Sequence, residues 1–452
     1  MFRHKSKHAL GTYPLIRNAP YRIGRGHHLL THLPNQSTHA SLSSQGAFKR
    51  TFSALANPTF RKIFAFGGFY YVYRTMELAV LSWFVLTLTD SEFQVALVGV
   101  SRIAPMFIFG LTAGGLSDRF SRPRLMAIGQ ASNLTVAVVM VGILLTGMGQ
   151  YWHAHVAIFI TGTTWALDYA SRRALLGDIF TGRALTNATS LDAGLVTGTN
   201  MIGPLLGTAV IRFFEFHGAY ILICLLTVGA ISFVLSIRNL PRATSAVVNR
   251  GSPRAQIQDS LNLLRTNRVL LGAVLVTIAF NFFGWPFMQM VPVIARNILG
   301  TGELGFGLLL SGLGLGALTG AIFLAWAQPS SHGNVYIGGS MILMVSTAGF
   351  AWSPWYLLAF ICMFFAGIGL AGFATMQPVI PLEAVAPEQR GKAMGAIVLG
   401  IGFQAIGMTV MGVVAELFGP RLAVSLMAMG GIFMLIVLRT MFPALRDART
   451  NN

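Results

Sequence analysis

Several ionisable side chains stand inside long apolar stretches of this sequence, and the chemistry of four of them is the first clue to function. Arg74 and Glu77 fall in the first stretch, Arg102 in the second and Asp168 in the fourth. Charged groups in a hydrocarbon layer are costly and mark proton, ion or ligand pathways. Ion pairing within one helix is the alternative, and we favour it for Asp168, which has Arg172 four residues later. For Glu77, three residues after Arg74, we favour a functional role.

Glu77 is the strongest candidate for proton exchange. It stands about halfway along its stretch, and the sequence around it is rich in aromatic residues: Phe69, Tyr70, Tyr71, Tyr73 and Trp83. Such surroundings remove water from a carboxylate. A carboxylate that exchanges a proton and attracts a cation is what an antiporter requires. An anionic cargo would instead make Arg74 and Arg102 its contacts.

The seventh apolar stretch offers amides and aromatic rings around Pro286. Its candidate ligand contacts are Asn281, Trp285 and Gln289. Facing a central cavity, these groups would suit an amphiphilic ligand. Facing lipid, they would form an aromatic belt instead, and the pattern leaves both interpretations open.

Twelve apolar stretches must position these residues. The chain is 54% hydrophobic and only 10% charged, against about 25% charged for soluble domains. A stretch of about 20 apolar residues crosses the roughly 30 Å core of a bilayer. The predicted spans are 63–89, 95–115, 124–147, 153–175, 188–211, 218–237, 269–293, 304–327, 334–352, 355–380, 393–415 and 422–442.

The longest polar break divides the spans into two sets of six. We predict a basic cytoplasmic tail over 1–55, an N-terminal bundle over 56–237, a linker over 238–268, a C-terminal bundle over 269–442 and a second tail over 443–452. An organelle transit peptide is the alternative interpretation of the acid-free N-terminus. Within the linker, Ile257, Leu261 and Leu264 predict a short amphipathic helix.

The distribution of basic residues predicts the orientation. With the N-terminus in the cytoplasm, 27 of the 32 Lys and Arg residues fall on that side and only Arg212, Arg296 and Arg421 on the other. Positive residues favour the cytoplasmic side, so both termini are predicted to lie there. The net charge of +18 does not indicate nucleic-acid binding, because the basic residues occupy short loops and form no recognisable binding motif.

The loop between the second and third stretches is the most specific motif. It reads Gly114-Gly-Leu-Ser-Asp118-Arg119-Phe-Ser-Arg122-Pro-Arg124. This segment resembles the signature loop of the major facilitator superfamily, matched at Gly114, Leu116, Asp118, Arg119 and Arg122, with departures at Ser121 and Pro123. The resemblance implies a latch that closes the cytoplasmic side, with an ordinary basic loop as the alternative.

The fifth stretch contains Gly203-Pro204-Leu-Leu-Gly207. It resembles the core of a signature associated with drug/proton antiporters. Small residues also allow helices to pack closely without any such role, so both interpretations stay open.

Wider similarities extend from about Ala56 to Phe442. Segments such as Ala56-Asn-Pro-Thr-Phe-Arg and Pro387-Glu-Gln-Arg390-Gly-Lys are similar to the bacterial drug- and siderophore-exporting branch, which includes enterobactin exporters. The resemblance implies an all-α membrane protein with twelve transmembrane helices in two pseudo-symmetric six-helix bundles. The superfamily's proton-relay motif has an Arg where this chain has Ile158, so coupling would pass to Glu77 or Asp168.

We therefore predict a secondary active exporter of amphiphilic, drug-like or siderophore-like molecules that works by alternating access and a proton gradient. A non-transporting sensor or scaffold and an exporter of anionic metabolites are the alternatives. The expected partners are the substrate, protons and the lipid bilayer of a plasma or inner membrane, with the protein a monomer. No enzymatic motif such as HExxH or Walker A is present, so we expect no enzyme activity, cofactor or metal.

Overall fold

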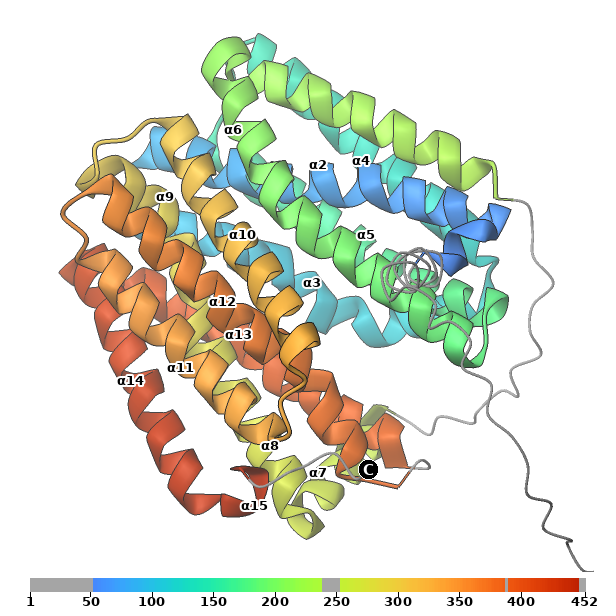
Figure 1. Ribbon diagram of the computed structural model, residues 1–452. Helices are drawn as coiled ribbons and strands as arrows, with labels where there is room; N and C mark the ends of the chain where they lie inside the picture. The colour runs from blue at the N-terminus through green and yellow to red at the C-terminus, as the bar shows by residue number, and fades with distance from the viewer. Residues whose placement is uncertain (1–51, 238–252, 387–388, 447–452) are drawn as a thin grey trace, which may run out of the picture. The chain divides into compact units, whose positions relative to one another are not determined.

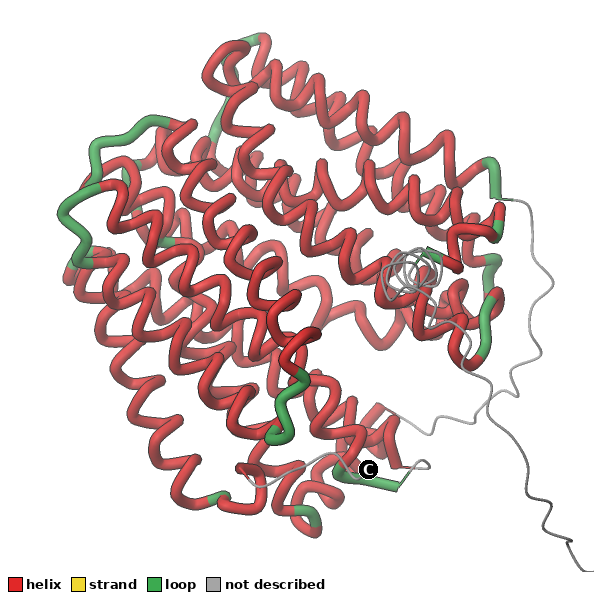
Figure 2. Tube along the Cα trace, viewed as in Figure 1, coloured by secondary structure: helices red, strands yellow, loops and turns green. Residues whose placement is uncertain are grey.

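The computed structural model describes residues 52–237, 253–386 and 389–446, and helices make up nearly all of them (Figures 1 and 2). The predicted N-terminal tail lies outside this description up to residue 51. The same holds for residues 447–452 of the predicted C-terminal tail and for 238–252 of the predicted linker.

The N-terminal half of the described chain consists of six long helical segments. After a short 3-10 turn, η1 (Ser53–Ala56), they are α2 (Pro58–Thr89), α3 (Glu92–Arg119), α4 (Arg122–Leu145), α5 (Tyr151–Ile179) and α6 (Gly182–Leu235). α6 contains two segments, because Phe214 and Glu215 leave the helical conformation and Glu215 has a φ of 55°. The start of α2 is fixed by Asn57, whose side chain accepts from the backbone N–H groups of Thr59 and Phe60.

The C-terminal half also provides six segments. The first runs through α8 (Arg268–Ala279), η2 (Phe280–Gly284), η3 (Trp285–Gln289), α9 (Val291–Val293) and η4 (Ile294–Ile298). The others are α10 (Glu303–Ala327), α11 (His332–Ala351), α12 (Tyr356–Glu383), α13 (Arg390–Phe418) and α14 (Pro420–Met441), followed by the short α15 (Pro443–Arg446). The first segment alternates α, π and 3-10 turns around Pro286 and Pro292, since proline removes a backbone donor.

Each of the twelve predicted spans corresponds to one of these segments. Eight helices of the described residues are long and apolar enough to cross a membrane, and one of the eight is α6 with its two segments. The remaining three long helices are α2, α3 and α5, which carry Arg74, Glu77, Arg102 and Asp168. The helices that hold charge are therefore the less apolar ones.

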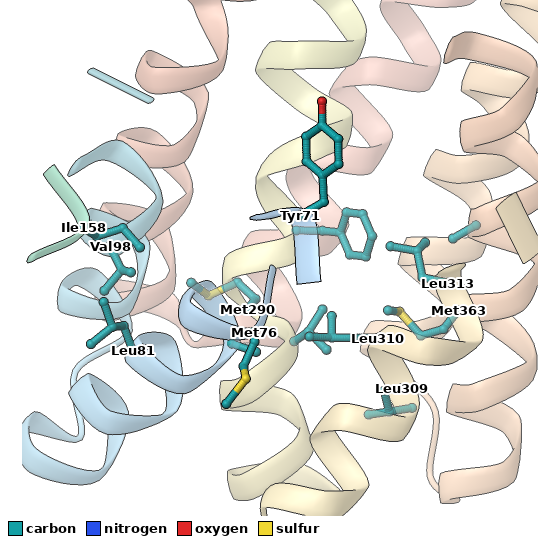
Figure 3. Close-up of a cluster of buried hydrophobic side chains, with 14 of the residues drawn as sticks. Tyr71, Met76, Leu81, Val98, Ile158, Met290, Leu309, Leu310, Leu313 and Met363 are labelled. Atoms are coloured by element: carbon teal, nitrogen blue, oxygen red, sulfur yellow. The ribbon is translucent and has the colours of Figure 1, made fainter. Parts of the chain in front are cut away.

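Apolar side chains from both halves form one large buried cluster. Figure 3 shows Leu81, Val98 and Ile158 together, from α2, α3 and α5. Ile158 occupies the place where the resembling proton relay has an Arg, and here it is fully buried among apolar neighbours. No cation at this position is available for coupling.

The amphipathic helix predicted in the linker is present as α7 (Pro253–Thr266). It docks on α13 through a 2.8 Å salt bridge between Asp259 and Lys392 and a 3.0 Å hydrogen bond from the Ser260 hydroxyl to the Lys392 carbonyl. Ser260 and Leu263 are buried, and Leu264, one of the predicted apolar positions, packs against the cluster that contains Leu263, Leu270 and Ala393. Leu261, also predicted for the apolar face, is 47% exposed, and the side chain of Ile257 lies outside the described residues.

Candidate functional site

A cavity of about 310 Å³ lies where the two halves meet. One wall comes from α2, α3, α5 and α6, and the other from η3, α10, α12 and α13. Ligand pockets usually span about 300 to 1,000 Å³. The space therefore suits a small molecule that touches both halves.

Two arginines face this cavity from the N-terminal half. The guanidinium of Arg74 on α2 stacks over the Trp165 ring at 3.9 Å. Arg102 on α3 donates a hydrogen bond of 3.4 Å to the backbone carbonyl of Arg74. Among the described residues, neither arginine forms a salt bridge and no Asp or Glu lines the cavity. The cavity wall is therefore positively charged.

The rest of the lining is neutral. Aromatic rings and amide groups stand among aliphatic side chains: Trp165, Trp285, Phe306, Asn200, Gln289 and Gln404. Rings and aliphatic groups favour an apolar ligand body, whereas amides can orient its polar atoms. Trp285 and Gln289, two of the three contacts expected from the seventh span, are thus at the cavity.

Asn281, the third expected contact, does not line the cavity. It is buried on η2 and donates a 2.9 Å hydrogen bond to the Thr277 carbonyl one turn earlier. In an ideal α-helix Asn281 and Trp285 would share a face. The π turn of η2 changes the rotation per residue between them, which separates their directions.

Glu77 lies beside the arginines but behind the cavity wall. Its side chain is 3% exposed, bonds with the Thr161 side chain, and is close enough to Arg102 and Arg74 for electrostatic interaction. The salt bridge with Arg74 that the three-residue spacing allowed is not formed, because the Arg74 side chain stacks on Trp165 instead. Glu77 can therefore influence a ligand only through its neighbours.

Asp168 lies close enough to both Arg172 and Arg74 for electrostatic interaction. The expected pairing with Arg172 is replaced by a salt bridge between Arg172 and Asp192, with oxygen–nitrogen distances of 2.6 and 2.9 Å. Arg172 also donates to the Ile63 carbonyl at 3.2 Å. Asp168 is buried, and one of its carboxylate oxygens has no hydrogen-bond partner.

Asp192 was missed by sequence reasoning, which considered only partners within one helix. The available signal was its place in the first turns of the fifth span. That region follows the short loop after Arg172, so the two side chains occupy the same end of neighbouring helices.

The structure describes only part of the signature loop. The side chains of 110–119, which include Gly114, Leu116, Asp118 and Arg119, lie outside the described residues. Arg122 at the start of α4 forms a salt bridge with Asp178 and donates a 3.0 Å hydrogen bond to the Ala174 carbonyl of α5. This end of the loop is thus fastened to α5 of the same half.

The Gly203-Pro204-Gly207 motif of α6 packs against α2. A side chain at Gly203 would collide with Thr75 and the Val72 carbonyl, and one at Gly207 would meet Met76. Pro204 lines the cavity. The two glycines therefore permit the close approach of two helices that carry the cavity wall.

A family model described as "Transmembrane secretion effector", of the major facilitator type, matches residues 49–329, more than half of the chain. The chain belongs to this family.

Curated relatives of this chain are transporters. The staphyloferrin A transporter of Staphylococcus aureus is 21% identical over 361 residues, covering 79% of this chain and 89% of the relative. Macrolide efflux protein A of Streptococcus pyogenes is 19% identical over 77% of this chain and 86% of its own length. The multidrug transporter MdfA of Edwardsiella ictaluri is 26% identical over 63% and 69%.

Solved structures confirm the fold. A bacterial homologue of the human lysosomal transporter Spinster, in an inward-facing and unoccupied conformation, superposes with a TM-score of 0.68 at 12% identity, covering 86% of this chain and 98% of that one. A D-xylose–proton symporter gives 0.68 at 14% identity with the same coverage. The predicted major facilitator fold is thus confirmed, and the chain is a multi-pass membrane transporter, not an enzyme.

Polar contacts join the two halves of the transporter at one end of the bundle. Glu416 of α13 accepts from the Ser91 hydroxyl at 2.9 Å and from the Phe93 N–H at 3.1 Å, at the N-terminus of α3. Beside it, Arg296 pairs with Asp90 at 3.2 Å and donates to the Leu86 carbonyl at 2.8 Å. A carboxylate at a helix N-terminus is stabilised by the helix dipole, so these contacts hold the two halves together at this end.

Proposed function

We propose that this transporter exports amphiphilic small molecules by alternating access around the cavity between its halves. The observation that carries the proposal is the composition of the cavity wall, where each half contributes and rings alternate with amides and cations. Secondary carriers of this architecture bind substrate between their halves. Rocking of the halves about such a site would open it to each side in turn.

The names of the relatives support export. They include a staphyloferrin A transporter, a macrolide efflux protein and a multidrug transporter. Siderophores, macrolides and drugs are small molecules with polar and apolar parts, and a mixed lining accommodates such molecules. The exported class is therefore proposed as drug-like or siderophore-like.

Proton coupling is assigned to Glu77. Its carboxylate is buried beside Arg102 and Arg74, the two arginines of the cavity, whereas Asp168 interacts most strongly with Arg172 and less strongly with Arg74. A proton on Glu77 changes the charge that the two cavity arginines experience. Uptake and release of that proton would thus alter substrate binding without Glu77 touching the substrate.

Orientation follows from the basic loops. With both termini cytoplasmic, the end fastened by Glu416 and Arg296 faces away from the cytoplasm, in a plasma or inner membrane. The Asp118–Arg119 loop then lies at the cytoplasmic end, where it would latch the alternate state. We further propose that one chain suffices for transport, since one chain supplies both walls of the cavity.

Efflux from cells tests this function. Cells that carry the gene are loaded with dansylglycine, its uncharged amide or the amine N-dansylethylenediamine, and retained fluorescence is followed with and without a proton ionophore. We expect faster loss of at least one probe in cells with the gene, and slower loss after the ionophore. Equal retention of all three probes with and without the gene would support a scaffold or sensor instead.

Two glycine-to-valine variants provide a test of the contact between the halves and its matched control. A side chain at Gly314 of α10 would lie 2.8 Å from Met201 of α6, whereas Gly338 of α11 has open space. Gly314→Val should therefore block closure of the halves and abolish efflux, while Gly338→Val retains it. Both variants insert valine into a helix, so the intrinsic helix cost is similar.

A further inference from the structure

We propose that the substrate is an organic anion, with its anionic group bound by Arg74 and Arg102 and its apolar body against the C-terminal half. This inference rests on the proposed function and specifies the class of molecule. The central observation is the sign of the charge in the cavity: two guanidinium groups face it, and no described lining residue is acidic.

The two arginines lack a carboxylate partner within the described residues. Neither takes part in a salt bridge, whereas the fully buried Arg172 is paired with Asp192. A cation at membrane depth is costly unless a counter-charge is supplied. A substrate anion supplies that charge when the cavity is filled.

Both guanidinium groups are held in place before a ligand arrives. Stacking on Trp165 fixes Arg74, and the hydrogen bond to the Arg74 carbonyl fixes Arg102. A guanidinium has five N–H donors, so these contacts leave donors for the cavity. Their planar arrangement suits a carboxylate, sulfonate or phosphate group.

The opposite wall has no charge among its described residues. The C-terminal half contributes rings and aliphatic groups such as Trp285, Phe306, Leu310 and Leu313, with amides from Gln289 and Gln404. A ligand with one anionic and one apolar end would therefore contact each half with the matching end. Such a ligand joins the two halves, which is what alternating access requires of a substrate.

Glu77 balances part of this charge from behind the wall. It is close to both arginines, but it is buried and outside the cavity lining. Asp168 is also buried, close to Arg74 and outside the lining. Because neither carboxylate lines the cavity or forms a salt bridge with the two arginines, the described cavity surface itself presents only positive charge.

Matched probes test the charge preference. The purified full chain in lipid nanodiscs is titrated with dansylglycine, which is anionic, with its uncharged amide, and with the cationic amine N-dansylethylenediamine. Dansylglycine is expected to bind about tenfold more tightly than the amide, which corresponds to one charge-assisted pair, and the amine most weakly. The preference should fall as salt is raised, because electrostatic attraction is screened.

Arginine variants locate the preference. The wild-type chain is expected to bind dansylglycine about tenfold more tightly than the amide. Arg74→Gln and Arg102→Gln should each remove most of this difference in affinity, while Arg102→Lys retains part of it. Arg212→Gln is the matched control, because Arg212 is an exposed arginine remote from the cavity lining. An unchanged ratio in both glutamine variants would overturn the assignment.

The wild-type titration also decides the question if a variant fails to fold. Tighter binding of the amide or the amine, or binding of none of the three, overturns the anion proposal. Export of those probes from cells would leave the transport proposal intact. Tight binding of dansylglycine without efflux of any probe would overturn export and keep the anion site.

Discussion

At the scale of residues, Arg102 is the link between the cavity and the buried carboxylate. It holds the Arg74 carbonyl through a 3.4 Å hydrogen bond and lies close enough to Glu77 to interact electrostatically. The charge state of Glu77 therefore affects the cavity through its electrostatic interaction with Arg102, which lines the cavity. The Thr161 side chain is a hydrogen-bond partner of Glu77. Tyr73 and Tyr220 are the other titratable groups near Glu77.

Glu77→Gln should reduce the rate of transport driven by the pH gradient about tenfold or more. The amide keeps the shape of the carboxylate but cannot exchange a proton. Reconstituted protein with an imposed pH gradient provides the measurement, and expression in the membrane should be unchanged. If Glu77→Gln transports normally and Asp168→Asn does not, the coupling role belongs to Asp168.

Arg172→Met should lower the free energy of unfolding by about 3 kcal/mol, because Asp192 loses its buried partner. The double variant Arg172→Met with Asp192→Leu should recover part of that loss, since Asp192 no longer carries an unpaired charge, while Asp168 still lacks its neighbour Arg172. Thermal unfolding of the detergent-solubilised protein measures both. Arg173→Met, one residue along and exposed, is the control. Equal losses in the control and in Arg172→Met would contradict the assigned role of the cluster.

At the scale of elements, polar contacts between α3 and α13 join the two halves at one end of the transporter. The Glu416 carboxylate lies at the N-terminus of α3, where two donors bind it, and Arg296 fastens the end of α2 nearby. These groups sit at helix ends and not along the helices. Small rotations of either half therefore separate them together, which suits a gate.

Glu416→Gln should shift the transporter toward the state open at this end. Loss of the charge weakens two hydrogen bonds and changes the open-to-closed ratio by about fivefold, or about 1 kcal/mol. Electron–electron distance measurements between spin labels at exposed Met148 and Leu422 would report longer distances. Glu215→Gln, whose side chain is 82% exposed, should leave the distribution unaltered, and an identical response in both variants would contradict the gate.

Sequence predicted the elements well because apolar length alone identifies a membrane span. The order of six and six helices followed from that signal, and the linker helix followed from the spacing of its apolar residues. The sequence could not predict which face of the seventh span meets the cavity, because η2 and η3 break the α-helical period between Asn281 and Gln289. Likewise the Arg172–Asp192 pair joins different helices, and spacing within one helix favoured the wrong partner for Arg172.

At the scale of the whole molecule, positive charge is concentrated in two places. Basic loops crowd one end, and cations line the central cavity while acids lie behind it. An organic anion leaving an inside-negative compartment moves with the membrane potential, which contributes about 2.3 kcal/mol per charge at 100 mV. The membrane potential would therefore favour export of the proposed class of substrate.

Cysteine labelling tests the orientation. In a chain with Cys224 and Cys362 replaced by serine, Met148→Cys should react with an impermeant thiol reagent added to intact cells, whereas Asn262→Cys on α7 should react only after the membrane is opened. Both positions are exposed in the structure, so burial does not explain a difference. The reverse pattern would contradict cytoplasmic termini.

Concentrative transport by the purified protein is the measurement that bears on both proton-driven export and the anion site. Proteoliposomes with an imposed pH gradient are supplied with dansylglycine, and its concentration on each side is measured over time. We expect accumulation above the starting concentration, loss of that accumulation with a proton ionophore, and failure of Arg102→Gln to accumulate the probe. Equilibration no faster than in protein-free liposomes would contradict this expectation.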